Sequence, residues 1–288
     1  MLLGMVMALG SSCAMAPSQP DDSGLKLSDV TYRERDSLRV VQLLSMQVPA
    51  GENDVLFYAR RFIGVPYVAH TLEVADPERL VVNLRELDCT TYVETVLALA
   101  MTHRAGSKDF MDFCRNLERI RYRGGRLNGY LSRLHYFAWW MHDNEKAGIV
   151  EEVTDATHFT APMQVNDYYM TKHPDSYKML RLHPEWVKEI KKMEKAENGA
   201  DGTYLPKSKT KLGQRHLPVQ NGDVIAIVTG KAGLDYSHLG FAVWGTDGYL
   251  HLLNASSLYH RVVEDENSFY SYLQHQTSAL GARFLRLK

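Results

Sequence analysis

The sequence predicts an α+β protein in which a helical first half packs against an antiparallel β-sheet. Before about residue 200 the apolar residues recur at helical spacing, whereas after Pro218 short β-rich runs are separated by glycine and aspartate turns. The 288 residues are 45% hydrophobic, which is enough for one large core or two small ones. No linker is strong enough to divide the chain into independent domains.

Two helices are expected before residue 65. Residues 28–47 combine mixed charge with an apolar stripe, and residues 53–64 form a second helical pattern that Gly64 ends. Pro66 prevents this helix from continuing, so the chain is expected to run extended toward the next helix, which starts after Cys89. The apolar stripe of the first helix consists of Val40, Val41, Leu43 and Leu44.

The rest of the chain divides into a helix-rich middle and a sheet. Helical patterns occupy residues 107–200, interrupted by "RYRGGRLNGY", and we expect this stretch to be a helical insertion. Short turns between the later runs indicate an antiparallel meander. These runs are "NGDVIAIVT", "SHLGFAVWG", "GYLHLLNAS" and "GARFLRL".

The first residues are typical of an export signal, because a short apolar run is followed by small residues and a polar tail. Two cleavage sites are open: "AMA" at 14–16 has the signal-peptidase form, and "SSC" at 11–13 resembles a lipoprotein site with lipid on Cys13. We expect a periplasmic protein that contacts a membrane only through such a lipid. The predicted parts are a signal (1–16), a polar tail with an N-terminal helix (17–50) and the main domain (51–288).

The charge balance argues against nucleic acid as a partner. Lysine and arginine number 33 and aspartate and glutamate 34, so the formal net charge is −1. Global charge therefore gives no reason to expect nucleic acid as a partner. The locally basic run at 206–216 is better explained as a solvated loop.

Two cysteines remain once Cys13 is removed or lipidated, which is too few for a disulfide framework. Cys114 shares a helical face with Phe110 and Leu117, and it is expected to be a small buried side chain. Cys89 is therefore the one cysteine whose sequence context indicates a possible nucleophile.

Asp88 can cap the helix that begins beside Cys89. The sulfur would then lie beside free backbone N–H groups at the positive end of the helix dipole, which predicts a thiol pKa lowered toward neutrality. The competing interpretation is one more small side chain in a core, so a nucleophile at Cys89 requires a base elsewhere in the chain.

His238 is the best candidate for that base. It opens the strand "SHLGFAV" beside Ser237, and Gly240 lets another backbone or a ligand approach closely. A nucleophile on a helix followed by a histidine on a sheet has the chain order of papain-like enzymes.

The next strand offers Asn254 and His251 as the group that orients the imidazole. A three-residue turn around Gly248 pairs Asn254 with Gly240, on the same face as His238 and within side-chain reach. The same register places His251 on the other face, where it is expected to be a packing or surface residue.

Five stretches together resemble the N-acetylmuramoyl-L-alanine amidase-like family of the NlpC-type papain-like cell-wall cysteine hydrolases. The resemblance spans residues 51–288 and implies a papain-like fold with the nucleophile helix packed on the sheet. It implies the nucleophile on Cys89, the base on His238 and the third member on Asn254, where many relatives have histidine. The stretches are "GVPYVAHTLE", "LVVNLRELDCTTYVE", "RYRGGRLNGYLSRLHYFAWW", "SHLGFAVW" and "HLLNASS".

The resemblance also implies a substrate cleft. Tyr67 would help to hold the oxyanion, although a buried core tyrosine is an equally good interpretation of that residue. Arg133 could pair with a substrate carboxylate. The other candidates for substrate contacts are Glu73, Arg85, Asp88, Tyr130, Ser132, His135 and Ser237.

The expected activity is hydrolysis of the amide bond between N-acetylmuramic acid and L-alanine in peptidoglycan fragments, through a thioester. No cofactor and no metal is expected, since the chain has no HExxH and no clustered Cys/His ligands. Three alternatives stay open: a γ-D-glutamyl endopeptidase of the stem peptide, a non-catalytic wall-binding module, and an acyltransferase that uses the same thioester.

Overall fold

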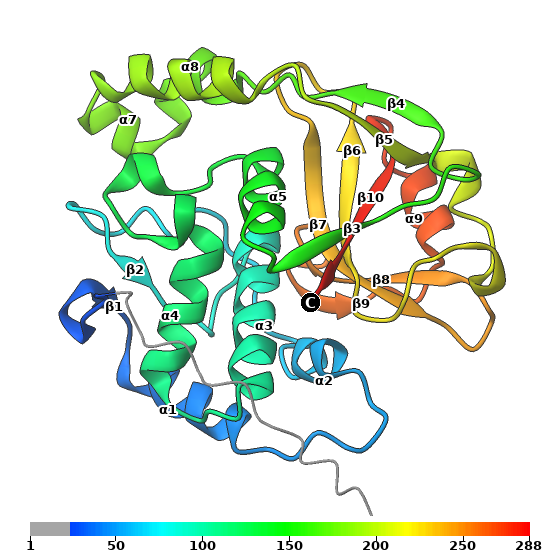
Figure 1. The fold of residues 1–288 in the computed structure, drawn as a ribbon, viewed down its shortest axis with the longest axis horizontal. Coiled ribbons are helices and arrows are strands. Elements are labelled where there is room, and N and C mark those ends of the chain that lie inside the picture. The colour runs from blue at the N-terminus through cyan, green and yellow to red at the C-terminus, as the bar shows by residue number, and fades with distance from the viewer. Residues whose placement is uncertain (1–23) are drawn as a thin grey trace, which may run out of the picture.

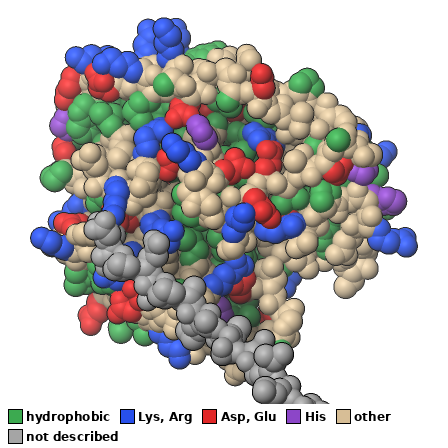
Figure 2. All heavy atoms as spheres, viewed as in Figure 1, with side chains coloured by type: hydrophobic (Ala, Val, Ile, Leu, Met, Phe, Trp, Pro, Cys, Tyr) green, Lys and Arg blue, Asp and Glu red, His purple; other side chains and the backbone are tan. Residues whose placement is uncertain are grey.

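The computed structural model describes residues 24–288, so the predicted export signal and Cys13 lie outside the described residues. Within residues 24–288, no helix is both long and apolar enough to cross a membrane. Figure 2 shows lysine and arginine side chains interspersed with aspartate and glutamate over the described part of the face drawn.

Most helices lie on one side of the molecule and the eight-stranded sheet, with α9, on the other, as Figure 1 shows, which confirms the predicted α+β class. The central helix α3 (Cys89–Arg104) lies between α4 (Phe110–Arg121) and the sheet. Its side chains are buried around almost the whole circumference, from Thr91 to Thr102. The remaining helices are α2 (Asp54–Arg60), α5 (Phe137–Lys146), α6 (Tyr169–Lys172), α7 (Lys178–Leu182), α8 (Trp186–Glu197) and α9 (Phe269–Gln274).

The two predicted N-terminal helices are present. α1 (Glu34–Leu44) buries Val40, Leu43 and Leu44, but Val41 is 40% exposed, so its place in the apolar stripe was wrong. Adjacent residues of a helix point about 100° apart, and a stripe that centres on Val40 and Leu44 leaves Val41 on the solvent side. α2 begins after Asn53, whose side chain accepts the Leu56 N–H at 2.9 Å.

The sheet has eight strands, in the order β4-β5-β10-β6-β7-β8-β9, with β3 also paired to β10. The meander from β6 to β9 is antiparallel, as the short turns predicted. The chain then returns through α9, and its last strand pairs with β6. The strands are β3 (Val150–Val153), β4 (Ala161–Gln164), β5 (Asp201–Pro206), β6 (Val224–Thr229), β7 (Tyr236–Trp244), β8 (Leu250–Ser256), β9 (Arg261–Glu264) and β10 (Ala279–Leu287), and a separate pair joins β1 (Val30–Thr31) to β2 (Leu80–Val81).

The stretch predicted as a helical insertion, 107–200, also contributes the two strands β3 and β4 to the sheet. Each has four residues and lies near an edge of the sheet, where local alternation is too short to predict a strand. Both faces of the sheet are covered. Leu239 and Phe241 of β7 face the helices, while Ala242 and Trp244 face a second core that includes α9.

Candidate active site

Cys89 is the first residue of α3, and Asp88 caps the helix as predicted. The Asp88 carboxylate accepts the Thr91 N–H at 2.8 Å, while the Thr91 hydroxyl accepts the Asp88 N–H at 2.9 Å. This reciprocal cap satisfies two backbone donors that would otherwise be unpaired, and it fixes where the helix begins. The thiol is therefore held at the start of the central helix.

The Cys89 thiol has a raised pKa, contrary to the expectation from the helix dipole. Burial, and secondly the negative charge of Asp88, raise the pKa of Cys89 to about 12. The N–H of Leu239 and the N–H and hydroxyl of Thr90 donate to the sulfur and act in the opposite direction. The prediction of a pKa near neutrality was wrong because loss of solvent and a neighbouring carboxylate outweigh these donors.

His238 is the residue of β7 next to Leu239, whose N–H donates to the Cys89 sulfur. Its Nε2 lies 2.9 Å from Oδ1 of Asn254 on β8. Burial lowers the pKa of His238, and the bond to Asn254 opposes that effect. Since Oδ1 accepts, Nε2 carries the proton and Nδ1 is left as the basic nitrogen.

The predicted register of the β7–β8 hairpin is confirmed, since Val243 pairs with His251 and Phe241 with Leu253. Gly248 has a φ of 80° in the turn, as expected of a left-handed position. His251 lies 3.0 Å from the Asp265 carbonyl and 3.1 Å from the Asp247 carboxylate, so it stabilises the hairpin end far from His238.

A pocket of about 240 Å³ opens beside Cys89, and Tyr67 lies in its wall. Tyr67 donates its N–H to the His260 carbonyl at 3.0 Å, which ties it to the turn between β8 and β9. Burial, and then the charges of Cys89 and Asp88, raise the pKa of Tyr67 to about 12. Its hydroxyl is therefore a protonated donor at neutral pH, near the thiol.

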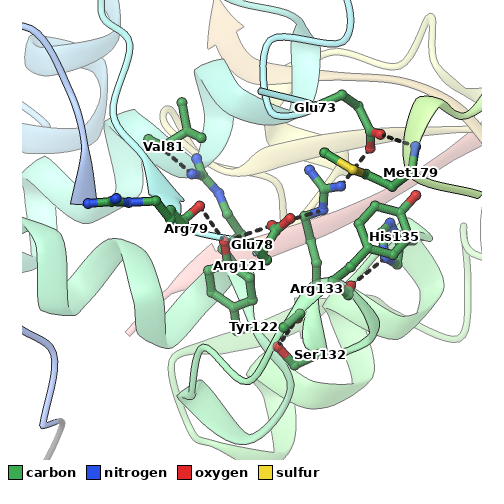
Figure 3. A network of polar contacts seen from close by, with 12 residues as sticks. Glu73, Glu78, Arg79, Val81, Arg121, Tyr122, Ser132, Arg133, His135 and Met179 are labelled. Carbon is green, nitrogen blue, oxygen red and sulfur yellow. Dashed lines mark hydrogen bonds and ion pairs between the residues drawn. The ribbon is translucent and has the colours of Figure 1, made fainter. Parts of the chain in front are cut away.

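Arg133 lies between two glutamates in the network drawn in Figure 3. Its guanidinium is 2.6 Å from Glu73 and 3.5 Å from Glu78, and all three side chains are largely buried. Glu73 also accepts the Met179 N–H at 3.1 Å, and Glu78 accepts the Tyr122 hydroxyl at 3.0 Å. Arg133 therefore neutralises protein carboxylates at the pocket wall, rather than presenting an unpaired charge.

The structure brings only some of the predicted substrate residues to this pocket. Glu73, Asp88, Arg133 and His135 line it. Tyr130 lies behind them and stacks on Trp186, with ring centroids 5.4 Å apart. The three others are elsewhere: Arg85 pairs with Asp36 of α1 at 3.1 Å, Ser132 donates to the Gly129 carbonyl at 2.7 Å, and Ser237 lines a different pocket beside His238.

Four titratable residues that line the pocket were not predicted: His70, Glu94, Arg121 and Tyr177. Glu94 and Arg121 form a buried ion pair of 2.6 Å. The sequence carries one signal for it, because Glu94 is the single acid within the apolar run of α3. Among residues 24–288, no group of three or more His, Cys, Asp or Glu is placed to hold a metal ion.

Comparisons with known proteins agree with this architecture. The family model described as "N-acetylmuramoyl-L-alanine amidase-like" (AmiA-like) matches residues 58–280. An N-acetylmuramoyl-L-alanine amidase from Bacteroides uniformis is 40% identical, with a TM-score of 0.76 over 82% of this chain and 98% of its own. A search of curated proteins found no significant match.

Two further solved structures are similar. A Bacteroides fragilis protein, provisionally described as a xylanase, is 41% identical over 80% of this chain and 99% of its own, with a TM-score of 0.74. A Legionella pneumophila protein of the DUF1460 family shares the fold at 23% identity, with a TM-score of 0.69 over 88% of this chain and 95% of its own. The family match over most of the chain, together with the amidase at 40% identity, shows that this chain belongs to the N-acetylmuramoyl-L-alanine amidase-like family.

Proposed function

We propose that this protein is a papain-like cysteine amidase of peptidoglycan fragments, which hydrolyses the bond between N-acetylmuramic acid and L-alanine. The observation that carries the proposal is that Cys89 meets β7 at Leu239, the residue next to the His238–Asn254 pair. The Leu239 N–H contacts the Cys89 sulfur, and the adjacent His238 is held by Asn254 at 2.9 Å. The site thus has a nucleophile, a base and an orienting group in the order of papain-like enzymes. We also propose that residues 1–16 direct export to the periplasm.

In the first step, His238 Nδ1 takes the proton of the Cys89 thiol while the sulfur attacks the lactyl carbonyl carbon. Because the thiol pKa is raised, we expect the proton to pass to His238 during the attack. A thiolate–imidazolium ion pair is not expected to form beforehand. The oxyanion accepts hydrogen bonds from the backbone N–H of Cys89 and from the Tyr67 hydroxyl. Asn254 holds the ring as it becomes positively charged.

In the second step, His238 Nδ1 returns its proton to the L-alanine nitrogen, and the carbon–nitrogen bond breaks to leave a thioester on Cys89. A water molecule then gives a proton to Nδ1 and attacks the thioester carbonyl. The thiolate leaves and takes up that proton, and the muramic acid carboxylate is released. The products are the sugar acid and a peptide with a free amino terminus.

The carboxylates of the pocket argue against glycoside hydrolysis, despite the similarity to the protein provisionally described as a xylanase. That chemistry needs one carboxylic acid and one carboxylate on opposite sides of a glycosidic bond. Here Glu73 pairs with Arg133, Glu94 pairs with Arg121, and Asp88 caps α3. None of the three is free for acid–base work at a sugar.

Mass spectrometry of muropeptides incubated with the protein tests the proposed function. We expect a free peptide that begins at L-alanine together with the peptide-free sugar. Products cut within the stem peptide would instead identify an endopeptidase. Transfer of the muramoyl group to an added amine would identify an acyltransferase, and no product at all would favour a binding module.

The pH profile of kcat/KM should show a single acid limb below pH 6.5. The step requires a neutral His238, whose pKa is lowered by burial, so activity is retained as the pH falls to 6.5 and is lost below that. The Cys89 thiol has a pKa of about 12, so it adds no limb near neutrality. Iodoacetamide alkylation at increasing pH checks this assignment, and a thiolate that titrates near pH 7 would contradict it.

Substitution of Gly240 by alanine should lower kcat/KM by roughly 10–100-fold with little change in KM. A Cβ at Gly240 would lie 2.7 Å from the Leu253 carbonyl and 2.9 Å from the Asn254 Cβ, so β8 must shift and carry the orienting amide with it. Gly213→Ala is the control, since Gly213 has a φ of −74° and its Cβ would meet only the Gly248 carbonyl, at 3.4 Å. Equal activity of the two variants would show that the placement of Asn254 is unimportant.

A further inference from the structure

A second pocket, of about 150 Å³, is lined by the proposed base, His238. Ser237 and His238 form part of it, where a bulge in β7 leaves Ser237 without a partner on β6. Lys231 comes from the turn between β6 and β7, and Gln276 and Ser278 come from the segment before β10. Residues far apart in the sequence thus build one cavity against His238.

The polar side chains of this second pocket are unused within the protein. Among residues 24–288, no hydrogen bond or ion pair engages the side chains of Lys231, Ser237, Gln276 or Ser278. Lys231 carries a positive charge, and the other three side chains can donate hydrogen bonds. No aspartate or glutamate lines the cavity. Unpaired hydrogen-bond donors around a positive charge, with no carboxylate in the pocket lining, favour the binding of an anion.

The pocket beside Cys89 has the opposite character. Glu73, Asp88 and Glu94 line it, and their partners Arg133 and Arg121 are already paired with them. Because both arginines are already paired, this pocket has no unpaired arginine for a substrate carboxylate. Of the two cavities, the one with Lys231 is therefore the favourable place for an acidic group.

In the proposed reaction, each of the two cavities binds one half of the substrate. The group that leaves must receive its proton from His238, so the released amine lies on the His238 side of the scissile bond. His238 lines the second pocket together with Ser237 and Tyr272. The second pocket therefore adjoins the group that protonates the leaving amine.

We propose that this pocket is the subsite for the leaving peptide and that Lys231 binds its nearest free carboxylate, the α-carboxylate of the D-glutamate after L-alanine. This inference rests on the proposed amidase function. The carboxylate lies five bonds beyond the scissile nitrogen, about 5 Å along the chain, which a lysine side chain can span. Lys231 is a specificity residue and takes no part in proton transfer.

The test compares two muramoyl tripeptides that differ only in whether this α-carboxylate is free or amidated. The unsubstituted protein should prefer the free acid by about tenfold in kcat/KM, as one charge-assisted hydrogen bond allows. Lys231→Met should abolish the preference through KM, with kcat unchanged, while Lys231→Arg should keep it. Lys211→Met, at an exposed lysine outside both pockets, should behave like the unsubstituted protein.

Binding of the same two tripeptides to Cys89→Ala, with and without Lys231→Met, gives a readout that does not depend on turnover. A preference for the free acid that Lys231→Met leaves intact would overturn the subsite while the amidase activity stands. Cleavage inside the stem peptide would overturn the amidase function, and the subsite with it. No preference in the unsubstituted protein would also overturn the assignment of Lys231.

Discussion

Cys89→Ala should reduce cleavage of the muramoyl–alanine bond by roughly 10⁴-fold or more. Without the sulfur no thioester forms, and His238 and the oxyanion donors retain only their weak effect on direct attack by water. The fold should persist, because the Asp88 cap that fixes the start of α3 uses no atom of the thiol. Quantification of the released peptide, with circular dichroism as a check on folding, measures the effect.

Cys114→Ala is the matched control for this experiment. Cys114 is fully buried in the core between α4 and its neighbours, and it lies outside both pockets. Its substitution should cost some stability and leave the rate of cleavage unchanged. Cleavage that survives in Cys89→Ala, or that disappears in Cys114→Ala with the fold intact, would remove Cys89 from the role of nucleophile.

Arg121→Met should destabilise the protein by about 3–5 kcal/mol, because it leaves Glu94 as a buried charge without its partner. The two side chains are 2% and 3% exposed and 2.6 Å apart, and Arg121 also donates to the Val81 carbonyl at 2.7 Å. The pair thus joins α4 to α3 and to β2. Burial raises the pKa of Glu94 in spite of Arg121, so the carboxyl should take up a proton in the variant. Urea denaturation measures the change in the free energy of unfolding.

Two further variants test whether the unpaired charge of Glu94 causes the loss of stability. Glu94→Met combined with Arg121→Met removes both charges, and it should recover most of the lost stability. Lys192→Met breaks an exposed pair with Glu189 on α8, at 3.0 Å, and should have no measurable effect. A double variant as unstable as Arg121→Met would show that packing and the bond to Val81, rather than the unpaired charge, account for the loss.

Local rules determined the parts of the site that lie close together in the sequence. Asp88 caps α3 because capping involves residues three positions apart. The pairing of His238 with Asn254 followed from the parity of one hairpin, since strand residues alternate between faces and a short turn fixes the register. The resemblance to the amidase-like family, which the family match confirms, was carried by short motifs in a fixed order.

Tertiary structure decided what depends on distant neighbours. The pKa of Cys89 depends on burial under Leu239 and on the charge of Asp88, and no local pattern shows whether solvent is excluded. Arg133 and Arg85 were both predicted near substrate, but only Arg133 lines the pocket. Their partners Glu73 and Asp36 lie 60 and 49 positions away in the chain. The second pocket draws on a turn, a bulge and the segment before β10. Periodicity and motifs act over a few residues, whereas burial and charge pairing arise only where the folded chain brings remote segments together.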